Sequence, residues 1–216
     1  EFVNEIPLSR GLGSSSAVIT SAIASAYACA NVELTKEKLL NLALSYEPHP
    51  DNIAPAVMGG FTVSTIENHE VRTLKKTMPN DIQAIVVIPN RPISTAQSRK
   101  TLPLKYTKEE SIFNLSHSSL LTGAMFSENW DMLRVASQDV FHQQYRMKAM
   151  PELFEVQKIA LESGALMSTL SGSGSTFFNL VHRSDAKMIC KKLRTKFSHF
   201  NILIFDLDND GIIVNN

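Results

Sequence analysis

Residues 7–17 read Pro7-Leu8-Ser9-Arg10-Gly11-Leu12-Gly13-Ser14-Ser15-Ser16-Ala17, and the rest of the chain is organised around them. A short β-like run over 1–6 precedes this stretch, and small apolar residues over 17–32 follow it in a helical pattern. Glycine lets a backbone approach an anion closely, and the free N–H groups of a first helical turn point at it. Serine hydroxyls donate to phosphate oxygens or bind Mg²⁺. The stretch predicts an anion site at a helix start; the alternative is that the serines only cap the helix.

The stretch matches neither of two common phosphate-binding sequences. It lacks a Gly-Lys-Ser/Thr triplet, and Gly11-Leu12-Gly13 is not followed by the third glycine of a dinucleotide site. A short glycine and serine loop is a weak signal alone, so its interpretation depends on features elsewhere in the chain.

Charge and hydropathy exclude two classes of partner. The chain has 216 residues with 21 basic and 21 acidic side chains, so its formal net charge is zero. The basic residues occur in ones and twos, which predicts no nucleic-acid partner. The longest strongly apolar run, 84–88, is far too short to span a bilayer, which predicts no membrane partner.

The two cysteines suggest a compartment. Cys29 and Cys190 lie in apolar helical surroundings and fit no metal-binding spacing. We interpret them as buried free thiols of a reducing environment, which favours a cytoplasmic protein.

The order of secondary structure predicts two α+β lobes with a boundary near 75–81. Thr35 is expected to cap a helix that ends near Glu47. Prolines and polar groups over 47–52 predict a stiff, extended turn. The remaining expected strands are 61–66, 71–74, 82–88, 166–170, 176–181, 202–206 and 212–214, the expected helices are 108–127, 130–147, 151–163 and 185–197, and 89–103 is expected to be a loop.

A polar cluster forms a second candidate site. Glu47, His49, Asp51 and Asn52 stand beside an apolar run that ends at Gly59-Gly60. One interpretation is a turn whose groups hydrogen-bond their own backbone. The other is a divalent cation held by Glu47, with Asp51 and Asn52 facing a polar substrate, since Mg²⁺ needs only one or two carboxylates plus substrate phosphates.

A second small-residue loop and two arginines complete the candidates. Residues 171–175 read Ser171-Gly172-Ser173-Gly174-Ser175, which is typical either of a flexible connector or of a backbone that approaches a phosphate closely. Arg99 and Arg146 are ordinary surface charges unless they converge. If they converge, they form a carboxylate clamp, because a guanidinium binds a carboxylate through two parallel hydrogen bonds.

These motifs together resemble the GHMP small-molecule kinases. The resemblance rests on 7–17, on His49-Pro50-Asp51-Asn52 with Gly59-Gly60, and on Leu170-Ser171-Gly172-Ser173-Gly174, in that order and spacing. Within this superfamily the chain is most similar to the homoserine kinases, through 47–56, 95–99 and 138–146. The resemblance implies transfer of the γ-phosphoryl group of ATP to the side-chain hydroxyl of L-homoserine, a step of threonine biosynthesis.

The resemblance also implies roles for individual residues. Asp51 would face the amino group of homoserine, Arg99 and Arg146 would face its carboxylate, and His49, Asn52 and Thr95 would line the same pocket, with no dedicated catalytic base. Mg²⁺ would be held by Glu47 and by Ser15 or Ser16. The residues expected to bind ATP are Pro7, Arg10, Gly11, Leu12, Gly13, Ser14, Ser15, Ser16, Ser171, Gly172, Ser173 and Gly174.

The fold implied by the resemblance has two lobes. We expect 1–78 to form an incomplete N-terminal lobe with the phosphate loop and the Mg²⁺ site. We expect 79–216 to form a C-terminal ferredoxin-like α/β plait with inserted helices. The family's N-terminal motif is absent, so an N-terminal part is expected to be missing. Members of this family usually form dimers, so the resemblance is compatible with a homodimer.

Two rival functions remain open. One is another GHMP kinase that phosphorylates mevalonate or a sugar; the paired arginines argue against it, because an uncharged sugar needs no carboxylate clamp. The other is a non-catalytic ligand sensor of the same fold. Glu47 and the serine loop argue against a sensor, which has no reason to hold Mg²⁺ at a γ-phosphate.

Overall fold

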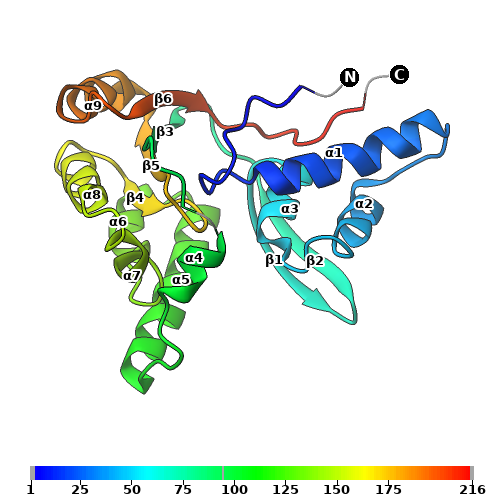
Figure 1. The fold of residues 1–216 in the computed structure, drawn as a ribbon, viewed down its shortest axis with the longest axis horizontal. Coiled ribbons are helices and arrows are strands. Elements are labelled where there is room, and N and C mark those ends of the chain that lie inside the picture. The colour runs from blue at the N-terminus through cyan, green and yellow to red at the C-terminus, as the bar shows by residue number, and fades with distance from the viewer. Residues whose placement is uncertain (1–2, 94, 215–216) are drawn as a thin grey trace. The chain divides into compact units, whose positions relative to one another are not determined.

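The structure is a computed structural model that describes residues 3–93 and 95–214, with only the backbone described for 95–97. The chain divides into two compact units, each described here by itself (Figure 1). Unit 1 comprises 1–6, 13–79 and 207–216, and unit 2 comprises 7–12 and 80–206. The division differs from the predicted one in two places. Residues 7–12 group with unit 2 and residues 207–216 with unit 1, because their contacts are made there.

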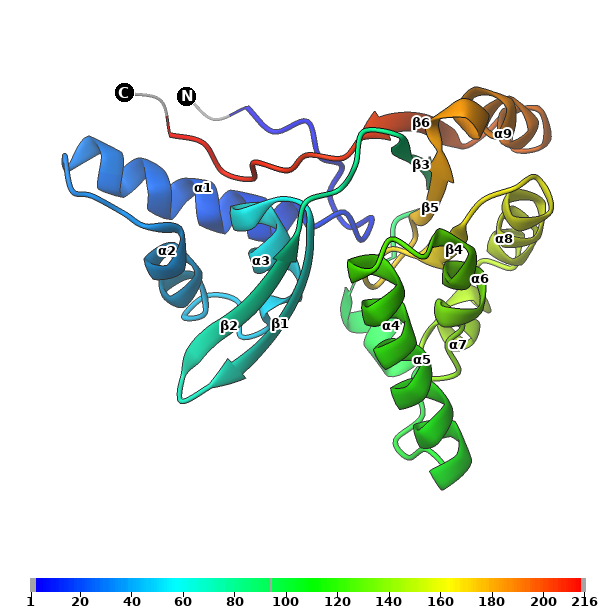
Figure 2. The same ribbon diagram turned by 180° about the vertical axis from the view of Figure 1, so that it is seen from behind.

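Unit 1 packs three helices beside a β-hairpin. Its elements are α1 (Ser14–Cys29), α2 (Lys36–Ala43), α3 (Pro50–Met58), β1 (Phe61–Glu67) and β2 (Glu70–Lys76). The antiparallel hairpin turns at Asn68 and His69, which both have positive φ angles, as a tight two-residue turn requires (Figure 2). Its buried core consists of Ala24, Leu39, Leu40, Ala43, Ile53, Ala54 and Val57.

Unit 2 is built on a four-stranded antiparallel sheet. Its strands are β3 (Ile82–Ile88), β4 (Met167–Leu170), β5 (Phe177–His182) and β6 (Asn201–Asp206), in the order β4-β5-β3-β6. The almost continuously buried β3 lies in the interior of the sheet, as its apolar sequence predicts. This order, with helices between β3 and β4 and between β5 and β6, is that of the expected ferredoxin-like plait.

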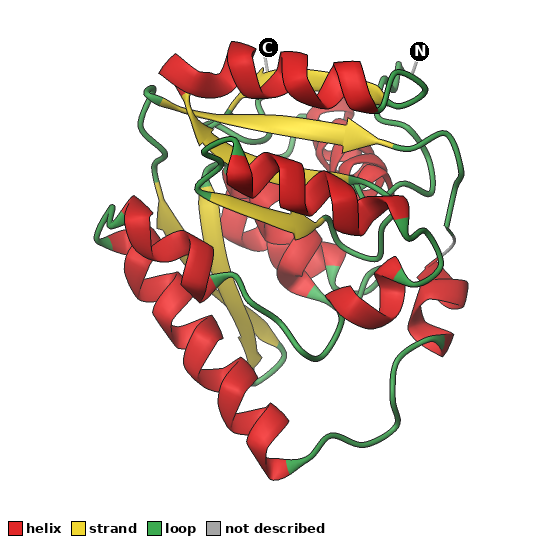
Figure 3. Cartoon of the chain, turned by 90° about the vertical axis from the view of Figure 1, so that its left-hand side faces the viewer, coloured by secondary structure: helices red, strands yellow, loops and turns green. Residues whose placement is uncertain are grey.

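Helices cover the sheet of unit 2 and fill its long connection. Helices α8 and α9 pack against each other and against the sheet (Figure 1). Together with β3, β5 and β6 they enclose a core that includes Ile85, Leu153 and Phe177. The helical segments of this unit are α4 (Thr95–Lys100), α5 (Lys108–Phe126), η1 (Trp130–Met132), α6 (Leu133–Ala136), α7 (Gln143–Met147), α8 (Glu152–Glu162) and α9 (Arg183–Lys196) (Figure 3).

Two expected strands do not form among the described residues. Residues 3–6 are irregular. The side chain of Asn4 accepts a hydrogen bond from the Ile6 N–H and donates one to the Ser14 hydroxyl, so the Ile6 N–H is not available to a neighbouring strand. Residues 212–214 are also irregular, and only the Ile212 N–H reaches a neighbouring carbonyl, that of Val57. A strand needs a partner along its length, and neither segment has one in this part of the structure.

Two helices were not expected. Helix α3 begins at Pro50, where proline is tolerated because a first-turn N–H has no helical partner. It also continues through Pro55, so the proline-rich sequence predicted a longer turn than the structure has. Helix α4 lies within the predicted loop 89–103, and the buried Ser98 fixes it by donating to the Ser173 carbonyl at 2.7 Å.

Two expected helices are shorter than predicted. Helix α2 ends at Ala43 and is followed by a turn rather than continuing to Glu47. The expected helix over 130–147 is interrupted between Ala136 and Gln143, because the side chain of Asp139 binds the backbone N–H groups of 141–143. One cysteine also differs, since Cys190 is buried but Cys29, the last residue of α1, is exposed. None of the helices in the described part has the length and apolar character needed to cross a membrane.

Candidate functional site

The first turn of α1 is open to an anion. Its N-cap, Gly13, has a φ angle of 71° and makes no side-chain cap bond, and the turn contains no acidic residue. Because α1 has 16 residues, its dipole and its free N–H groups favour negative charge at this end. The serines therefore do not simply cap the helix. Ser14 accepts a hydrogen bond from Asn4 Nδ2 at 3.0 Å, Ser14 and Ser16 are buried, and Ser15 is exposed.

The polar cluster lies beside this helix end within unit 1. A Cβ placed on Gly13 would lie 3.8 Å from Asn52 Oδ1, so the end of the glycine loop and the first turn of α3 are neighbours. Asp51 and Asn52 are exposed in that first turn, His49 precedes it as its exposed N-cap, and Glu47 is half-buried. Unit 1 thus places Gly13, the N-cap of α1, next to Asn52 of this cluster.

The cluster is not a turn that bonds itself. Within the described part of the chain, the side chains of Glu47, His49, Asp51 and Asn52 make no hydrogen bond or ion pair, so they are available to a ligand. The same part contains no group of three or more His, Cys, Asp or Glu side chains arranged to hold a metal ion. A cation here would therefore take most of its ligands from hydroxyls, water or a substrate.

Two small-residue loops contact each other within unit 2. The Ser171 hydroxyl donates to the Gly11 carbonyl at 2.6 Å, and the Thr176 N–H donates to the Arg10 carbonyl at 3.0 Å. A Cβ on Gly11 would overlap the Ser171 carbonyl oxygen, so only glycine allows this approach. The loop 171–175 therefore supports residues 7–12.

The loop 171–175 is anchored on further sides and is not a free connector. The Ser175 side chain is fully buried and donates to the Arg91 carbonyl at 2.8 Å. The carbonyl of Ser173 accepts from Ser98, and the carbonyl of Gly172 accepts from Arg146 Nη1 at 2.9 Å. These bonds join the loop to α4 and α7, the two helices that carry the candidate arginines.

The Arg146 guanidinium is partly buried, and the charges of Asp139 and Arg99 act on it. Burial lowers the pKa of the Arg146 guanidinium and the positive charge of Arg99 lowers it further, while the charge of Asp139 opposes the shift. The buried Nε of Arg146 also has no hydrogen-bond partner among the described residues, which is costly unless a ligand supplies one.

Arg10 and Thr95 complete the account of the expected residues. The Nη2 of Arg10 donates to the Asn90 carbonyl at 2.8 Å, and its buried Nη1 has no partner in the described structure. Pro7 and Leu12 belong to the same segment of unit 2. The side chain of Thr95 lies outside the described part, so its expected role stays a prediction.

Sequence reasoning missed two residues beside Arg146. Asp139 and Asn114 form a hydrogen-bonded pair at 2.8 Å between α5 and the segment before α7. Burial alone would raise the pKa of Asp139, but hydrogen bonds from His142 and Asn114 and from the backbone N–H groups of Gln143 and His142 hold it far below its usual range. Asp139 lies three residues before His142, the N-cap of α7, so the usual capping pattern does not identify it.

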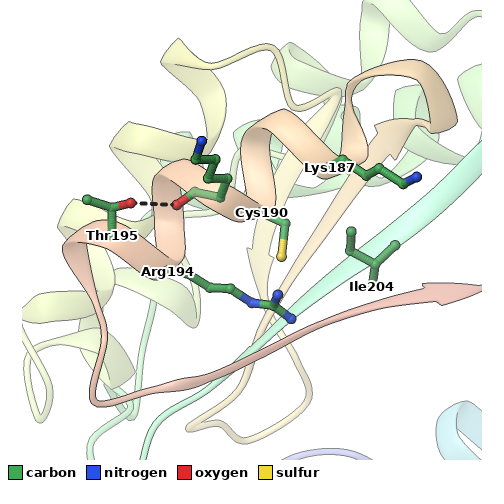
Figure 4. A pocket seen from close by; sticks show the side chains of 6 residues that line it. Lys187, Cys190, Arg194, Thr195 and Ile204 are labelled. Carbon is green, nitrogen blue, oxygen red and sulfur yellow. Dashed lines mark hydrogen bonds between the residues drawn. The ribbon is translucent and has the colours of Figure 1, made fainter.

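A hollow of about 380 Å³ on another face of unit 2 lies outside these motifs. Figure 4 shows Lys187, Cys190 and Arg194 extending from α9 on the side where Ile204 of β6 lies. Arg194 already donates to the Ile202 carbonyl, and burial raises the pKa of the Cys190 thiol. The thiol is therefore not activated as a nucleophile.

Comparisons with known proteins match both parts of the chain to one family. The models of the N-terminal and C-terminal domains of the GHMP kinases match residues 1–60 and 115–199. A homoserine kinase of Aliarcobacter butzleri is 63% identical over 212 residues, which are 98% of this chain and 72% of that protein. A homoserine kinase of Nitratiruptor is 63% identical over 213 residues, which are 99% of this chain and 73% of that protein. The crystal structure of a homoserine kinase from Cytophaga hutchinsonii has the same fold, with a TM-score of 0.88 at 23% identity over 96% of this chain and 69% of that one.

Proposed function

Because this chain belongs to the homoserine kinases of the GHMP kinase family, we propose a role for each half of its site in phosphorylating L-homoserine. In this reaction the substrate hydroxyl oxygen forms a bond to the γ-phosphorus of ATP, the bond to the β,γ-bridging oxygen breaks, and the hydroxyl proton is released. The products are O-phospho-L-homoserine and ADP.

The observation that carries the substrate assignment is the pair Arg99 and Arg146. The buried Nε of Arg146 has an unmet hydrogen-bonding need, and a second positive charge acts on the same guanidinium. A carboxylate satisfies both, because it accepts two parallel hydrogen bonds and carries the opposite charge. Mevalonate has a carboxylate, but it lacks the amino group that an acidic partner such as Asp51 would recognise.

The amino group of the substrate is the proposed partner of the exposed Asp51 in the first turn of α3. His49, Asn52 and Thr95 would line the same pocket. Phosphoryl transfer has a loose transition state, so the protein contributes mainly by positioning and by charge stabilisation. Asp51 is accordingly proposed as an anchor and not as a base.

The nucleotide phosphates are proposed to bind at the start of α1. The free N–H groups over 14–16 and the helix dipole favour negative charge there. Residues 7–12 would continue this phosphate loop, and Ser171, Gly172, Ser173 and Gly174 would act through the support they give to Gly11. ATP thus requires little from this chain beyond backbone donors.

The residues present fit a magnesium ion that is bound together with ATP. Ser15 is exposed, whereas Ser14 and Ser16 are buried, so we propose Ser15 and Glu47 as the protein ligands. One carboxylate and one hydroxyl suit Mg²⁺, which usually takes its other ligands from phosphates and water. When bound, the ion neutralises charge on the β- and γ-phosphate oxygens.

Assembly and location follow by inference from the family and from the chemistry. We infer a homodimer, which the exposed apolar side chains of Ile112 and Leu115 on α5 support. We also infer a cytoplasmic location, because the reaction consumes ATP. Sedimentation at several concentrations measures the oligomeric state directly.

The deciding experiment is ATP turnover with L-homoserine, L-serine, L-threonine, mevalonate and galactose. We expect strong turnover with homoserine that falls in Arg99→Ala and Arg146→Ala, mainly through a KM raised about 10- to 100-fold per lost charge-assisted pair. Turnover only with an alcohol that lacks a carboxylate would keep the kinase but exclude the clamp. ATP binding without any turnover would instead indicate a sensor.

A further inference from the structure

Helix α7, which carries Arg146, cannot hold its own position. It has five residues, and isolated helices of that length are not stable in water. Its last turn carries the proposed carboxylate-binding guanidinium, so whatever fixes α7 also fixes that group.

Asp139 holds the start of this helix. Its Oδ1 accepts from the Phe141 N–H at 3.0 Å, and its Oδ2 accepts from the N–H groups of His142 at 2.8 Å and Gln143 at 2.6 Å. The ring Nδ1 of His142 lies 3.5 Å from Oδ1. The Gln143 N–H belongs to the first turn of α7, and the His142 N–H belongs to its N-cap, so the carboxylate holds the start of α7.

Asn114 braces that carboxylate from α5. Its Nδ2 donates to Asp139 Oδ1 at 2.8 Å, and its Oδ1 accepts from the Val140 N–H at 2.9 Å. Because α5 has 19 residues and a complete capping box at Thr107, it is a firm support for a short neighbour. One amide side chain thus ties the segment before α7 to a long helix.

The far side of α7 is tied to the loop of the site. Gln143 Oε1 accepts from the Leu170 N–H at 3.0 Å, and Arg146 Nη1 donates to the Gly172 carbonyl at 2.9 Å. Gln143 and Arg146 are three residues apart, so they lie on the same face of the helix. A shift at the start of α7 would therefore move both contacts together.

We propose that Asp139, braced by Asn114, is a positioning residue that directs the Arg146 guanidinium toward the carboxylate of the substrate. Four N–H donors occupy the acceptor sites of Asp139, so the carboxylate does not form an ion pair with Arg146. Its charge still favours the protonated guanidinium. This inference rests on the proposed clamp function of Arg146.

The test compares homoserine kinetics in Asp139→Asn, Asn114→Ala and a matched control. Asp208 in unit 1 also accepts two backbone N–H groups, from Asp210 and Gly211, so Asp208→Asn makes the same chemical change in another turn. We expect Asp139→Asn to raise the homoserine KM about tenfold or more, since a small misplacement of a clamp is costly. The ATP KM and kcat should change by less than about threefold, and Asp208→Asn should leave the homoserine KM unchanged.

A double-mutant cycle distinguishes positioning from general damage. In an Arg146→Ala background, Asp139→Asn should change the homoserine KM by less than about twofold, because the group that it positions is gone. Asn114→Ala retains the carboxylate of Asp139 and removes one of its hydrogen-bond donors. It should therefore raise the homoserine KM by a smaller factor than Asp139→Asn does. It also tests the proposal if Asp139→Asn does not fold.

Three results would overturn this role for Asp139. They are an unchanged homoserine KM in both Asp139→Asn and Asn114→Ala, an equal KM increase with and without Arg146, or a matching rise in the ATP KM. If Arg146→Ala itself leaves the homoserine KM unchanged, the proposed clamp fails and this inference fails with it. If Arg146→Ala raises the homoserine KM but the Asp139 and Asn114 variants do not, the proposed clamp is retained and the positioning role of Asp139 is rejected.

Discussion

Neighbouring residues of one type have different environments in this chain, and the three serines at the start of α1 are the clearest case. The Ser14 hydroxyl accepts a hydrogen bond from Asn4, Ser16 is buried, and Ser15 is exposed to solvent. Their sequence context is almost uniform, so the proposal of Ser15 as the metal ligand rests on the direction in which the helix turns each hydroxyl.

Ser15→Ala is therefore expected to weaken the apparent affinity of the enzyme for Mg²⁺. Loss of one ligand should raise the Mg²⁺ concentration for half-maximal rate about tenfold, while Ser16→Ala should leave it unchanged. Initial rates at fixed ATP and varied Mg²⁺ measure both variants. An increase for Ser16→Ala with none for Ser15→Ala would reverse the assignment.

At the scale of elements, the contact between the two small-residue loops fixes the backbone of the proposed phosphate loop at Gly11. Gly11 has a φ angle of 76°, and an added Cβ would overlap the Ser171 carbonyl oxygen and lie 2.9 Å from Gly174 N. By contrast, Gly123 lies inside α5 with nothing within 4 Å of an added Cβ. These two glycines form a natural pair for comparison.

Gly11→Ala should destabilise the protein by about 2 kcal/mol or more, through strain at a positive φ and overlap with backbone. Gly123→Ala should stabilise it by about 0.5–1 kcal/mol, because alanine loses less backbone entropy in a helix. Thermal or urea unfolding measures both, and binding of an ATP analogue to Gly11→Ala reports on the phosphate loop. Equal stability of the two variants would contradict a tight contact at Gly11.

At the scale of the whole molecule, each unit has its own buried core, and the chain passes between the units more than once. Residues 7–12 and 13–16 are consecutive in sequence but belong to different units. Acid stability is a property of the molecule that one partly buried group in unit 2 should influence strongly. That group is Asp139, which faces His142, Asn114 and Arg146.

Asp139 should stabilise the fold at neutral pH and lose this effect in acid. Its pKa is held below the ordinary 3.8, so its contribution is complete above about pH 5 and disappears as the pH falls through the lowered value. Asp139→Asn should therefore cost about 1–2 kcal/mol at pH 7, with a smaller difference from wild type below pH 4. Urea unfolding at both pH values measures this difference in the free energy of unfolding. The same measurement in a His142→Gln background removes the titration of the imidazole that lies beside Asp139. A difference that widens in acid would contradict the prediction.

Much of the fold was predictable because it depends on local pattern. The apolar run 82–88 is β3 as expected, Thr35 caps α2 by accepting from the Lys38 N–H, and the hairpin turns between 67 and 70. Helix α3 was not predicted, because Pro50 and Pro55 read as helix breakers although the first lies where proline is tolerated. The interruption of the expected helix before α7 was not predicted, because the side chain of Asp139 accepts hydrogen bonds from the backbone N–H groups there.

By itself, the sequence determined the family, the plait of unit 2, and the residue types that phosphate and carboxylate chemistry require. Those properties depend on the periodicity of apolar residues, on the positions of glycine and proline, and on motifs of a few consecutive residues. Only the tertiary structure decided that Ser171 supports Gly11, that Arg146 donates to the Gly172 carbonyl, and that Asn114 braces Asp139. The reason is physical: each of these interactions joins residues distant in the chain, and neither partner's local sequence specifies the distance or direction between them.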